Sequence, residues 1–182
     1  MMKKITCVLI AVFLAGTFSF AQVKRIYAEK NGSFIKYKLT HPLHEVEATS
    51  TSEVCVIDAD TAKREIKQAL VQVGVTTFDS GNSNRDSHAM EVIDAITYPA
   101  AKFLSDKITQ NGDSLKISGK LTFHGITKEI TIDAIQKWGP KNLEVDGKFD
   151  ISLTAFKVDR PTLLLMPIND DMKFWFQENF NL

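Results

Sequence analysis

The sequence predicts an all-β protein that contains one short helix. Eight segments of strand length alternate apolar and polar side chains, which is the two-residue period of a strand with one buried face. Turn signals such as Asn111-Gly112-Asp113 and Gly139-Pro140 separate several of these segments. Eight antiparallel strands must hide their edges, so we expect either a sandwich or a closed barrel, and the periodicity does not distinguish the two.

The first predicted strand shows the alternation clearly, because Ile35, Tyr37 and Leu39 are separated by lysines. The eight predicted strands cover residues 35–40, 45–58, 65–78, 102–109, 114–124, 128–137, 143–154 and 171–180. A barrel of about eight strands is just wide enough to hold side chains or one small ligand. We expect space inside such a barrel next to the small residues of the presumed inner face, which are Gly74, Gly119 and Ala134.

One segment, residues 82–95, departs from the strand pattern and favours a helix between the third and fourth predicted strands. Asn82 or Ser83 is suited to cap its first turn, and Pro99 follows its end. Asp86 lies in the first turn of this helix, where the helix dipole favours a negative charge.

Residues 1–21 have the features of a secretory signal peptide. A short basic segment precedes an almost wholly apolar run over residues 5–20, and Ser19 and Ala21 are small residues before an expected cleavage at Gln22. The apolar run is short for a transmembrane anchor, and no stop-transfer segment follows it. We therefore expect an exported protein, periplasmic or secreted, whose single mature domain covers residues 22–182.

The composition is that of a soluble globular protein, with 44% hydrophobic and 24% charged residues. Removing residues 1–21 takes away two lysines and no acidic residue, which leaves 20 basic and 22 acidic side chains and a net charge near −2. This balance gives no reason to expect a nucleic-acid partner. The mature chain keeps one cysteine, Cys55, in an apolar run, so we expect a buried small hydrophobic residue rather than an intermolecular disulfide.

The sequence lacks the motifs of common catalytic sites. It contains no Gly-x-Ser-x-Gly elbow, no phosphate-binding glycine-rich loop and no His-Glu-x-x-His pair. The polar segment 79–88 allows an acid–base pair of Asp86 and His88, but a structural role is favoured because Arg85 and Asp86 suit a helix start. We therefore expect that the protein is not an enzyme.

A metal or haem site remains an alternative because all four histidines lie in the mature chain. They are His41, His44, His88 and His124. The first two are three residues apart, but Pro42 excludes the regular helix that would bring them together. No ligand pair has the tight spacing of structural zinc sites, so we expect no metal and no cofactor other than a bound lipid.

Three segments resemble the motifs of the YceI-like family. They are residues 33–41, residues 78–105 with the run Asp-Ser-Gly-Asn-Ser-Asn-Arg-Asp-Ser-His, and residues 119–128 with Thr-Phe-His-Gly. The three occur in the family's order and, with the last strand, span residues 33–181, essentially the whole mature chain. Two departures concern the turn His41-Pro-Leu-His44 and Lys157, where many members have a glycine after the aromatic residue.

This resemblance implies an eight-stranded antiparallel lipocalin-like barrel that holds a long-chain isoprenoid, isoprenoid quinone or related amphiphilic lipid for transport or storage. It also implies that alternate strand residues point inward and contact the lipid. The implied ligand-binding residues are Ile35, Tyr37, Leu39, Val73, Val75, Phe103, Ile117, Leu121, Ile132, Phe149, Ile151, Leu153, Phe174 and Phe176. Arg85, Asp86, His88 and His124 match motif positions, and we interpret them as structural.

Two alternatives to a lipid carrier stay open at this point. One is a metal- or haem-binding barrel, which requires at least two of the histidines to converge. The other is a stress-response structural protein whose core is filled by side chains, which the 12 phenylalanines would equally suit. For the favoured carrier we expect a lipid ligand, transient contact with a membrane, and a monomer or homodimer.

Overall fold

The computed structural model describes residues 23–182, so the predicted signal peptide lies outside the described residues. Ten antiparallel strands form one sheet in the order β1-β4-β5-β6-β7-β8-β9-β12-β2-β3. Their bounds are β1 Val23–Tyr27, β2 Phe34–His41, β3 His44–Ser50, β4 Val54–Asp60, β5 Glu65–Gly74, β6 Ala100–Asn111, β7 Ser114–Phe123, β8 Ile126–Trp138, β9 Asn142–Ser152 and β12 Asp171–Asn181. A two-stranded hairpin, β10 Thr162–Leu163 and β11 Met166–Pro167, lies outside this sheet.

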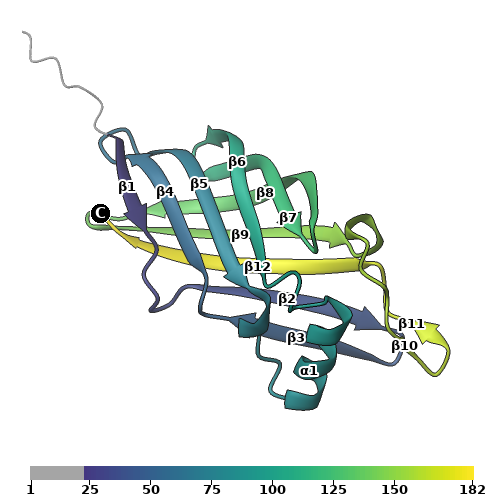
Figure 1. The fold of residues 1–182 in the computed structure, drawn as a ribbon. Helices are drawn as coiled ribbons and strands as arrows, with labels where there is room; N and C mark the ends of the chain where they lie inside the picture. The colour runs from purple at the N-terminus through teal and green to yellow at the C-terminus, as the bar shows by residue number, and fades with distance from the viewer. Residues whose placement is uncertain (1–22) are drawn as a thin grey trace, which may run out of the picture.

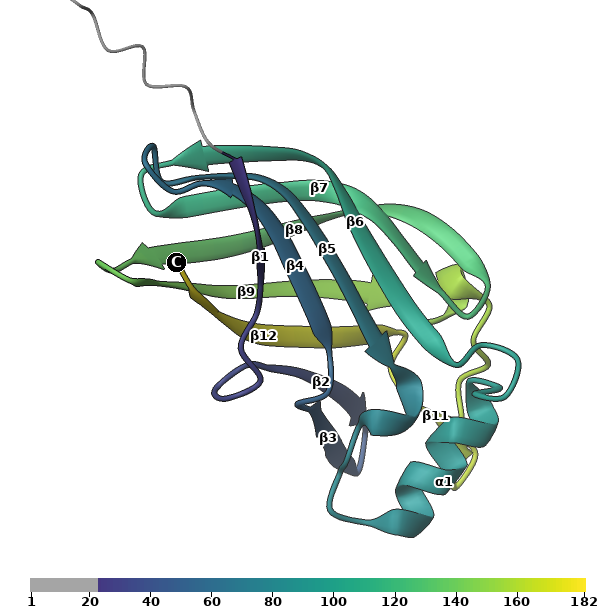
Figure 2. The same ribbon diagram turned by 60° about the vertical axis from the view of Figure 1, so that its left-hand side comes forward.

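The sheet curls round on itself (Figures 1 and 2). Two isolated bridges join its edges to the rest of the barrel. Ala28, just after edge strand β1, bridges Phe180 in β12. Thr49 in edge strand β3 bridges Asp79, which follows β5 and a 3-10 turn at Val75–Thr77. Both edge strands are thus partly covered, which limits pairing with other chains.

The prediction of an all-β antiparallel barrel with one helix is confirmed, but the number of strands is corrected. The predicted strand 45–58 is two strands, β3 and β4, because the chain leaves the sheet between Ser50 and Val54. Strand β1 was not predicted, since Ile26 is its only buried side chain. The two-residue strands β10 and β11 are too short to show any period.

The predicted helix is confirmed as α1, Ser83–Val92, between the third and fourth predicted strands. Asn82 caps it, because its side-chain oxygen accepts hydrogen bonds from the backbone N–H groups of Asn84 and Arg85 at 3.1 and 3.2 Å. None of the ten helical residues is fully buried. The helix lies across one end of the barrel beside the tips of β2 and β3 (Figure 2). Within residues 23–182 no helix is long and apolar enough to span a bilayer.

The expectation that small residues leave space in the barrel is wrong for all three positions named. Gly119 lies where a Cβ atom would come within 2.3 Å of the Leu104 carbonyl oxygen, so it permits close strand packing at the β6 bulge. A Cβ at Gly74 would lie 3.2 Å from the Thr77 side chain, and Ala134 is buried in the packed core. None of the three lines the internal cavity.

Candidate functional site: an apolar cavity with two different ends

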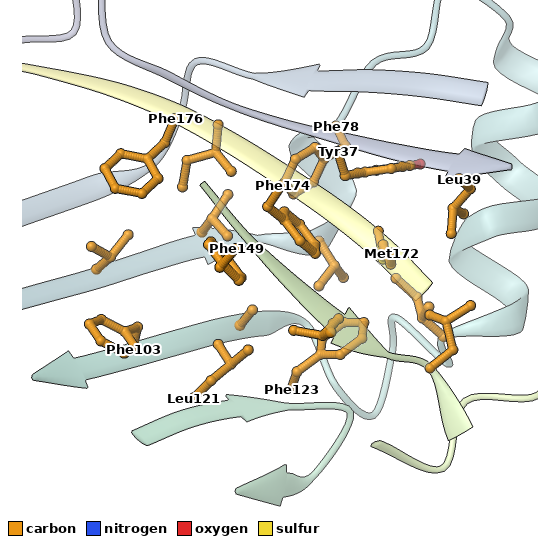
Figure 3. Close-up of a pocket in the computed structure, with 18 of the residues that line it drawn as sticks. Tyr37, Leu39, Phe78, Phe103, Leu121, Phe123, Phe149, Met172, Phe174 and Phe176 are labelled. Atoms are coloured by element: carbon orange, nitrogen blue, oxygen red, sulfur yellow. The ribbon is translucent and has the colours of Figure 1, made fainter. Parts of the chain in front are cut away.

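The interior of the barrel holds a cavity of about 430 Å³, a size typical of small-molecule sites. All 14 residues of the predicted ligand-binding set line it. Figure 3 shows Phe103, Leu121, Phe123, Phe149, Phe174 and Phe176 around this space. That these side chains contact a ligand stays a prediction. The cavity does argue against the alternative of a core filled by side chains.

Aromatic side chains shape the cavity wall. The rings of Phe149 in β9 and Phe174 in β12 are stacked, with centroids 4.8 Å apart and planes within 4°. The ring of Phe176 lies directly over Gly147, because a Cβ atom there would come within 2.2 Å of it. The strand pairing places Gly147 opposite Phe176, so glycine lets this ring lie against the sheet and keeps it out of the centre.

Tyr37 brings a hydroxyl group to the apolar wall. Its ring packs against Phe78 and Phe174, with centroids 5.2 and 6.2 Å away, and its hydroxyl points toward the side of the helix (Figure 3). Burial, followed by the nearby charge of Asp86, raises the pKa of Tyr37 above its ordinary value. The hydroxyl therefore stays protonated and is available as a hydrogen-bond donor.

The polar lining residues at one end mark the mouth of the cavity. His44 at the start of β3 and His88 in α1 are exposed and still line the cavity, so the space reaches solvent between the β2–β3 hairpin and the helix. Arg85 and Lys102 line the same region. The sequence does not indicate that His44, Arg85 and His88 lie at a mouth, because strand periodicity does not show how a helix lies across a barrel.

His41 helps to fix the shape of this mouth. It is 4% exposed, and its Nδ1 accepts a hydrogen bond from the backbone N–H of Leu43 at 3.2 Å. The proton therefore lies on Nε2, which donates to the carbonyl oxygen of Met166 at 3.0 Å. Through this contact the turn between β2 and β3 holds the β10–β11 hairpin in place.

The loop before α1 is fixed by its own polar side chains, which agrees with the structural interpretation of Arg85 and Asp86. Arg85 donates through Nε to the Ser80 hydroxyl at 2.8 Å and through Nη2 to the Ser80 carbonyl at 2.6 Å. Asp86 accepts from the Ser80 backbone N–H at 3.2 Å. His88 instead lies beside Glu91, at 3.8 Å, so Asp86 and His88 do not form the acid–base pair considered above.

His124 also has a structural position. It occupies the turn between β7 and β8 with a left-handed φ of +48°, and Gly125 follows with φ +71°. Its Nδ1 donates to the Phe156 carbonyl oxygen at 3.0 Å, and its ring meets Tyr98 edge to face. Phe156 precedes Lys157, which adopts a left-handed φ of +58°. The sequence therefore has lysine where the backbone conformation favours glycine.

The histidines do not converge on a metal-binding arrangement in the described residues. The rings of His41 and His44 are 5.1 Å apart, but His41 is hydrogen-bonded through both ring nitrogens and His124 binds a carbonyl elsewhere. Between residues 23 and 182, no group of three or more His, Cys, Asp or Glu side chains is placed to hold an ion. The geometry gives no support to the metal or haem alternative.

The opposite end of the cavity is closed and contains a buried acid that the sequence analysis missed. Glu178 in β12 is 2% exposed and lines the cavity, together with Cys55, Phe176 and Phe180. Burial, and then the nearby charge of Glu53, raises the pKa of Glu178 to about 9, so its carboxyl group is neutral at physiological pH. The signal was present in the sequence, since Glu178 falls in phase with the inward-facing Phe174 and Phe176.

Cys55 is confirmed as a buried free thiol. Burial is the main cause that raises its pKa well above the ordinary value, and the charges of Glu178 and Glu53 act in the same direction. A thiol that keeps its proton is a poor nucleophile and a poor metal ligand, so Cys55 contributes an apolar surface to this end of the cavity.

Comparisons with known proteins agree with the resemblance noted in the sequence. The model of the YceI-like domain matches residues 27–180. Protein YceI from Escherichia coli O157:H7 is 30% identical over 156 residues, which cover 81% of each chain. A UPF0312 protein from Pseudomonas fluorescens is 28% identical over 161 residues, which cover 83% of each chain.

Solved structures share the fold. The crystal structure of BcnA from Burkholderia cenocepacia has a TM-score of 0.76 at 22% identity, covering 84% of this chain and 98% of BcnA. A polyisoprenoid binding domain from Saccharophagus degradans has a TM-score of 0.67 at 12% identity, covering 88% and 99% of the two chains. The match to the family model spans nearly the whole described fold, and the chain belongs to the YceI-like family.

Proposed function

We propose that this protein binds a long-chain isoprenoid, isoprenoid quinone or related amphiphilic lipid in its cavity and transports or stores it outside the cytoplasm. The observation that carries this proposal is the cavity of about 430 Å³, whose wall is almost wholly apolar and open at one end. The polyisoprenoid-binding description of the Saccharophagus degradans domain, which has the same fold, supports the same ligand class. The signal-peptide pattern of residues 1–21 supports export.

Energetics favour such a carrier without any catalytic group. Burying one methylene group gains about 0.8 kcal/mol relative to water, so a long chain gains far more than binding requires. A bilayer offers the same gain, and the transfer from membrane to barrel is therefore close to balance. Ring contacts along the wall and hydrogen bonds to the polar end of the lipid then decide the direction, and a near balance also permits release.

Exposed leucines near the mouth support transient contact with a membrane. Leu164 and Leu165, at the tip of the β10–β11 hairpin, are 72% and 98% exposed, and Leu43 in the adjacent β2–β3 turn is 56% exposed. The two turns are held together by the His41 contact to Met166 and by a hydrogen bond from Asn169 N–H to the Thr40 carbonyl at 2.8 Å. These leucines give the mouth an apolar rim that suits a bilayer surface.

A pair of phenylalanine substitutions in β5 tests the proposed site. Ala69 is buried and lines the cavity, whereas its neighbour Leu70 is 44% exposed on the outer face. We expect Ala69→Phe to place a ring in the cavity and to lower the affinity for geranylgeraniol at least about tenfold, measured by displacement of a fluorescent polyene. Leu70→Phe adds the same ring outside and should bind like the wild type. Equal affinities of both variants for geranylgeraniol would contradict the proposal.

A further inference from the structure

The closed end of the cavity contains a buried carboxyl group, that of Glu178, in which neither oxygen atom is hydrogen-bonded. Both carboxyl oxygens of Glu178 are buried and without a hydrogen-bond partner among residues 23–182, and no other side chain there has both terminal oxygens in this state. Leaving such a group unsatisfied costs about 1–3 kcal/mol. Buried polar groups in native proteins are seldom left without a hydrogen-bond partner. A ligand that enters the cavity could supply the partner that Glu178 lacks.

Glu53, which lies near Glu178, also has one buried carboxyl oxygen without a hydrogen-bond partner, but two other buried polar side chains in this part of the barrel are satisfied. Gln136, 1% exposed, accepts a hydrogen bond from Trp138 Nε1 at 3.0 Å and donates to the Gly112 carbonyl at 3.3 Å. The Ser33 hydroxyl accepts from the backbone N–H of Asn179 at 3.0 Å. The side chains on the same face of β12, Phe176 and Phe180, and the residue paired with Glu178, Val145, are apolar and offer no partner.

We propose that the carboxyl group of Glu178 hydrogen-bonds an oxygen atom at the leading end of the bound lipid. The inference rests on the proposed lipid-binding function and narrows the ligand class to long chains that end in a carbonyl or hydroxyl group. Such a lipid enters with this end first, and its apolar chain extends along the phenylalanine-lined wall toward the mouth.

The charges around the cavity favour a neutral leading end. The titratable groups that face Glu178 are Glu53, which precedes β4, and the Cys55 thiol in β4; its paired residue in β9 is Val145. Glu53 also has an elevated pKa, caused first by burial. The cationic lining residues, Arg85 and Lys102, lie at the mouth. A phosphate or carboxylate group is therefore excluded from the closed end, where it would meet acids and no cation.

Protonation determines the direction of the hydrogen bond. Because burial holds the pKa of Glu178 near 9, its O–H group donates at neutral pH, and a ketone or quinone carbonyl, which only accepts, is a suitable partner. Above that pKa the carboxylate has no proton to donate and repels the carbonyl oxygen. The preference for a carbonyl should therefore disappear as the pH rises through about 9.

A matched pair of ligands tests this inference. One is the isoprenoid ketone farnesylacetone, and the other is the hydrocarbon in which a methylene group replaces its carbonyl. At about pH 7 the wild type should bind the ketone roughly five- to tenfold more tightly, the factor that one net hydrogen bond supplies. Glu178→Met should bring the two affinities together. Glu178→Gln should keep the preference, because its amide N–H donates.

The pH and a control variant complete the design. At about pH 10 the wild type should lose its preference for the ketone, whereas Glu178→Gln should retain it because an amide does not titrate. Glu129→Met, a substitution of an exposed glutamate on β8, should behave like the wild type. Circular dichroism and the melting temperature of each variant show that the barrel is intact.

The outcomes separate this inference from the function on which it rests. Equal wild-type affinities for ketone and hydrocarbon, or a preference that survives in Glu178→Met, would overturn the role of Glu178 and leave lipid binding established. If the wild type bound neither ligand, the proposed function would fail and this inference with it.

Discussion

The two ends of the barrel differ in how deeply their side chains are buried. At the closed end, the Ala28–Phe180 bridge seals the sheet, and Leu143 and Phe180 are 0% and 1% exposed. At the mouth, α1 has no fully buried residue, and leucines of two turns face solvent. The comparison indicates that buried side chains are concentrated where the cavity ends, whereas the helix and turns that a lipid would pass on the proposed route are less buried.

The largest difference between the ends should appear on truncation of a buried side chain. Phe180→Ala at the closed end removes a fully buried ring and should lower the free energy of unfolding by about 3–5 kcal/mol. Ile168→Ala at the mouth removes a partly buried side chain that already borders the cavity, and it should cost less than about 1.5 kcal/mol. Urea denaturation measures both, and similar losses would refute the contrast.

The pH dependence of stability should also originate at the closed end. In the unfolded chain Glu178 loses its proton near its ordinary pKa of 4.5, whereas in the folded protein it keeps the proton until about pH 9. The contribution of Glu178 to stability is thus fully present below its unfolded pKa and decreases as the pH rises toward 9, by roughly 1.4 kcal/mol per pH unit.

Urea unfolding of the wild type and Glu178→Gln at several pH values between about 6 and 9 checks this effect. The free energy of unfolding of the variant should change clearly less with pH, because its amide does not titrate. The remaining pH dependence is expected from Glu53, whose pKa is also raised. Parallel profiles of the two proteins would mean that Glu178 ionises in the folded state near its ordinary pKa.

Removing the N-cap of α1 tests whether the helix at the mouth unfolds independently of the closed end. Asn82→Ala removes the acceptor for the backbone N–H groups of Asn84 and Arg85 and should destabilise α1 by about 1 kcal/mol. Because the helix has no fully buried residue, we expect faster amide hydrogen exchange in α1 while the strands of the closed end exchange as before. Uniformly faster exchange across the barrel would show that the helix and the closed end unfold together.

The smallest expected effect concerns the exposed hairpin turn. Leu164 and Leu165 have left-handed φ values of +51° and +65°, which Asn-Gly adopts with less strain. Replacing the pair by Asn-Gly should raise the free energy of unfolding by about 0.5–1 kcal/mol and weaken cosedimentation with phospholipid vesicles. Gly112→Asn, in the β6–β7 turn away from the mouth, serves as the control: it changes a turn residue with a left-handed φ and should leave vesicle binding unchanged. Unchanged vesicle binding of the hairpin variant would argue against membrane contact through these leucines.

Periodicity predicted the strands that have one buried face and many residues. Ile35, Tyr37 and Leu39 lie on one face of β2, as their spacing predicts, and they line the cavity, as the resemblance to the family implies. Residues 45–58 resemble a single strand because Val and Thr continue across the break, whereas in the fold β3 is the last strand of the sheet and β4 lies next to the opposite edge. The role of Gly119 also depended on tertiary structure, since the carbonyl of Leu104 that it approaches belongs to another strand.

The candidate site could be predicted only in part from the sequence. Alternation predicts which side chains share a buried face, and the resemblance to the family implies that they line a cavity, but the position of the mouth depends on how α1 packs across the barrel end. Glu178 could have been noticed as an acid in phase with Phe174 and Phe176, although its burial depends on the Ala28 bridge beside Phe180, which closes the sheet. A residue that interrupts an apolar face is therefore a better indicator of a binding site here than the residues that form the face.

Native mass spectrometry of the mature protein, purified from its own host and followed by organic extraction, tests the central claim most directly. We predict one lipid per chain, with the mass of an isoprenoid or related long-chain compound that carries an oxygen atom, and its absence from Ala69→Phe. A wild-type protein that is purified without lipid and takes up no isoprenoid when offered would contradict the account.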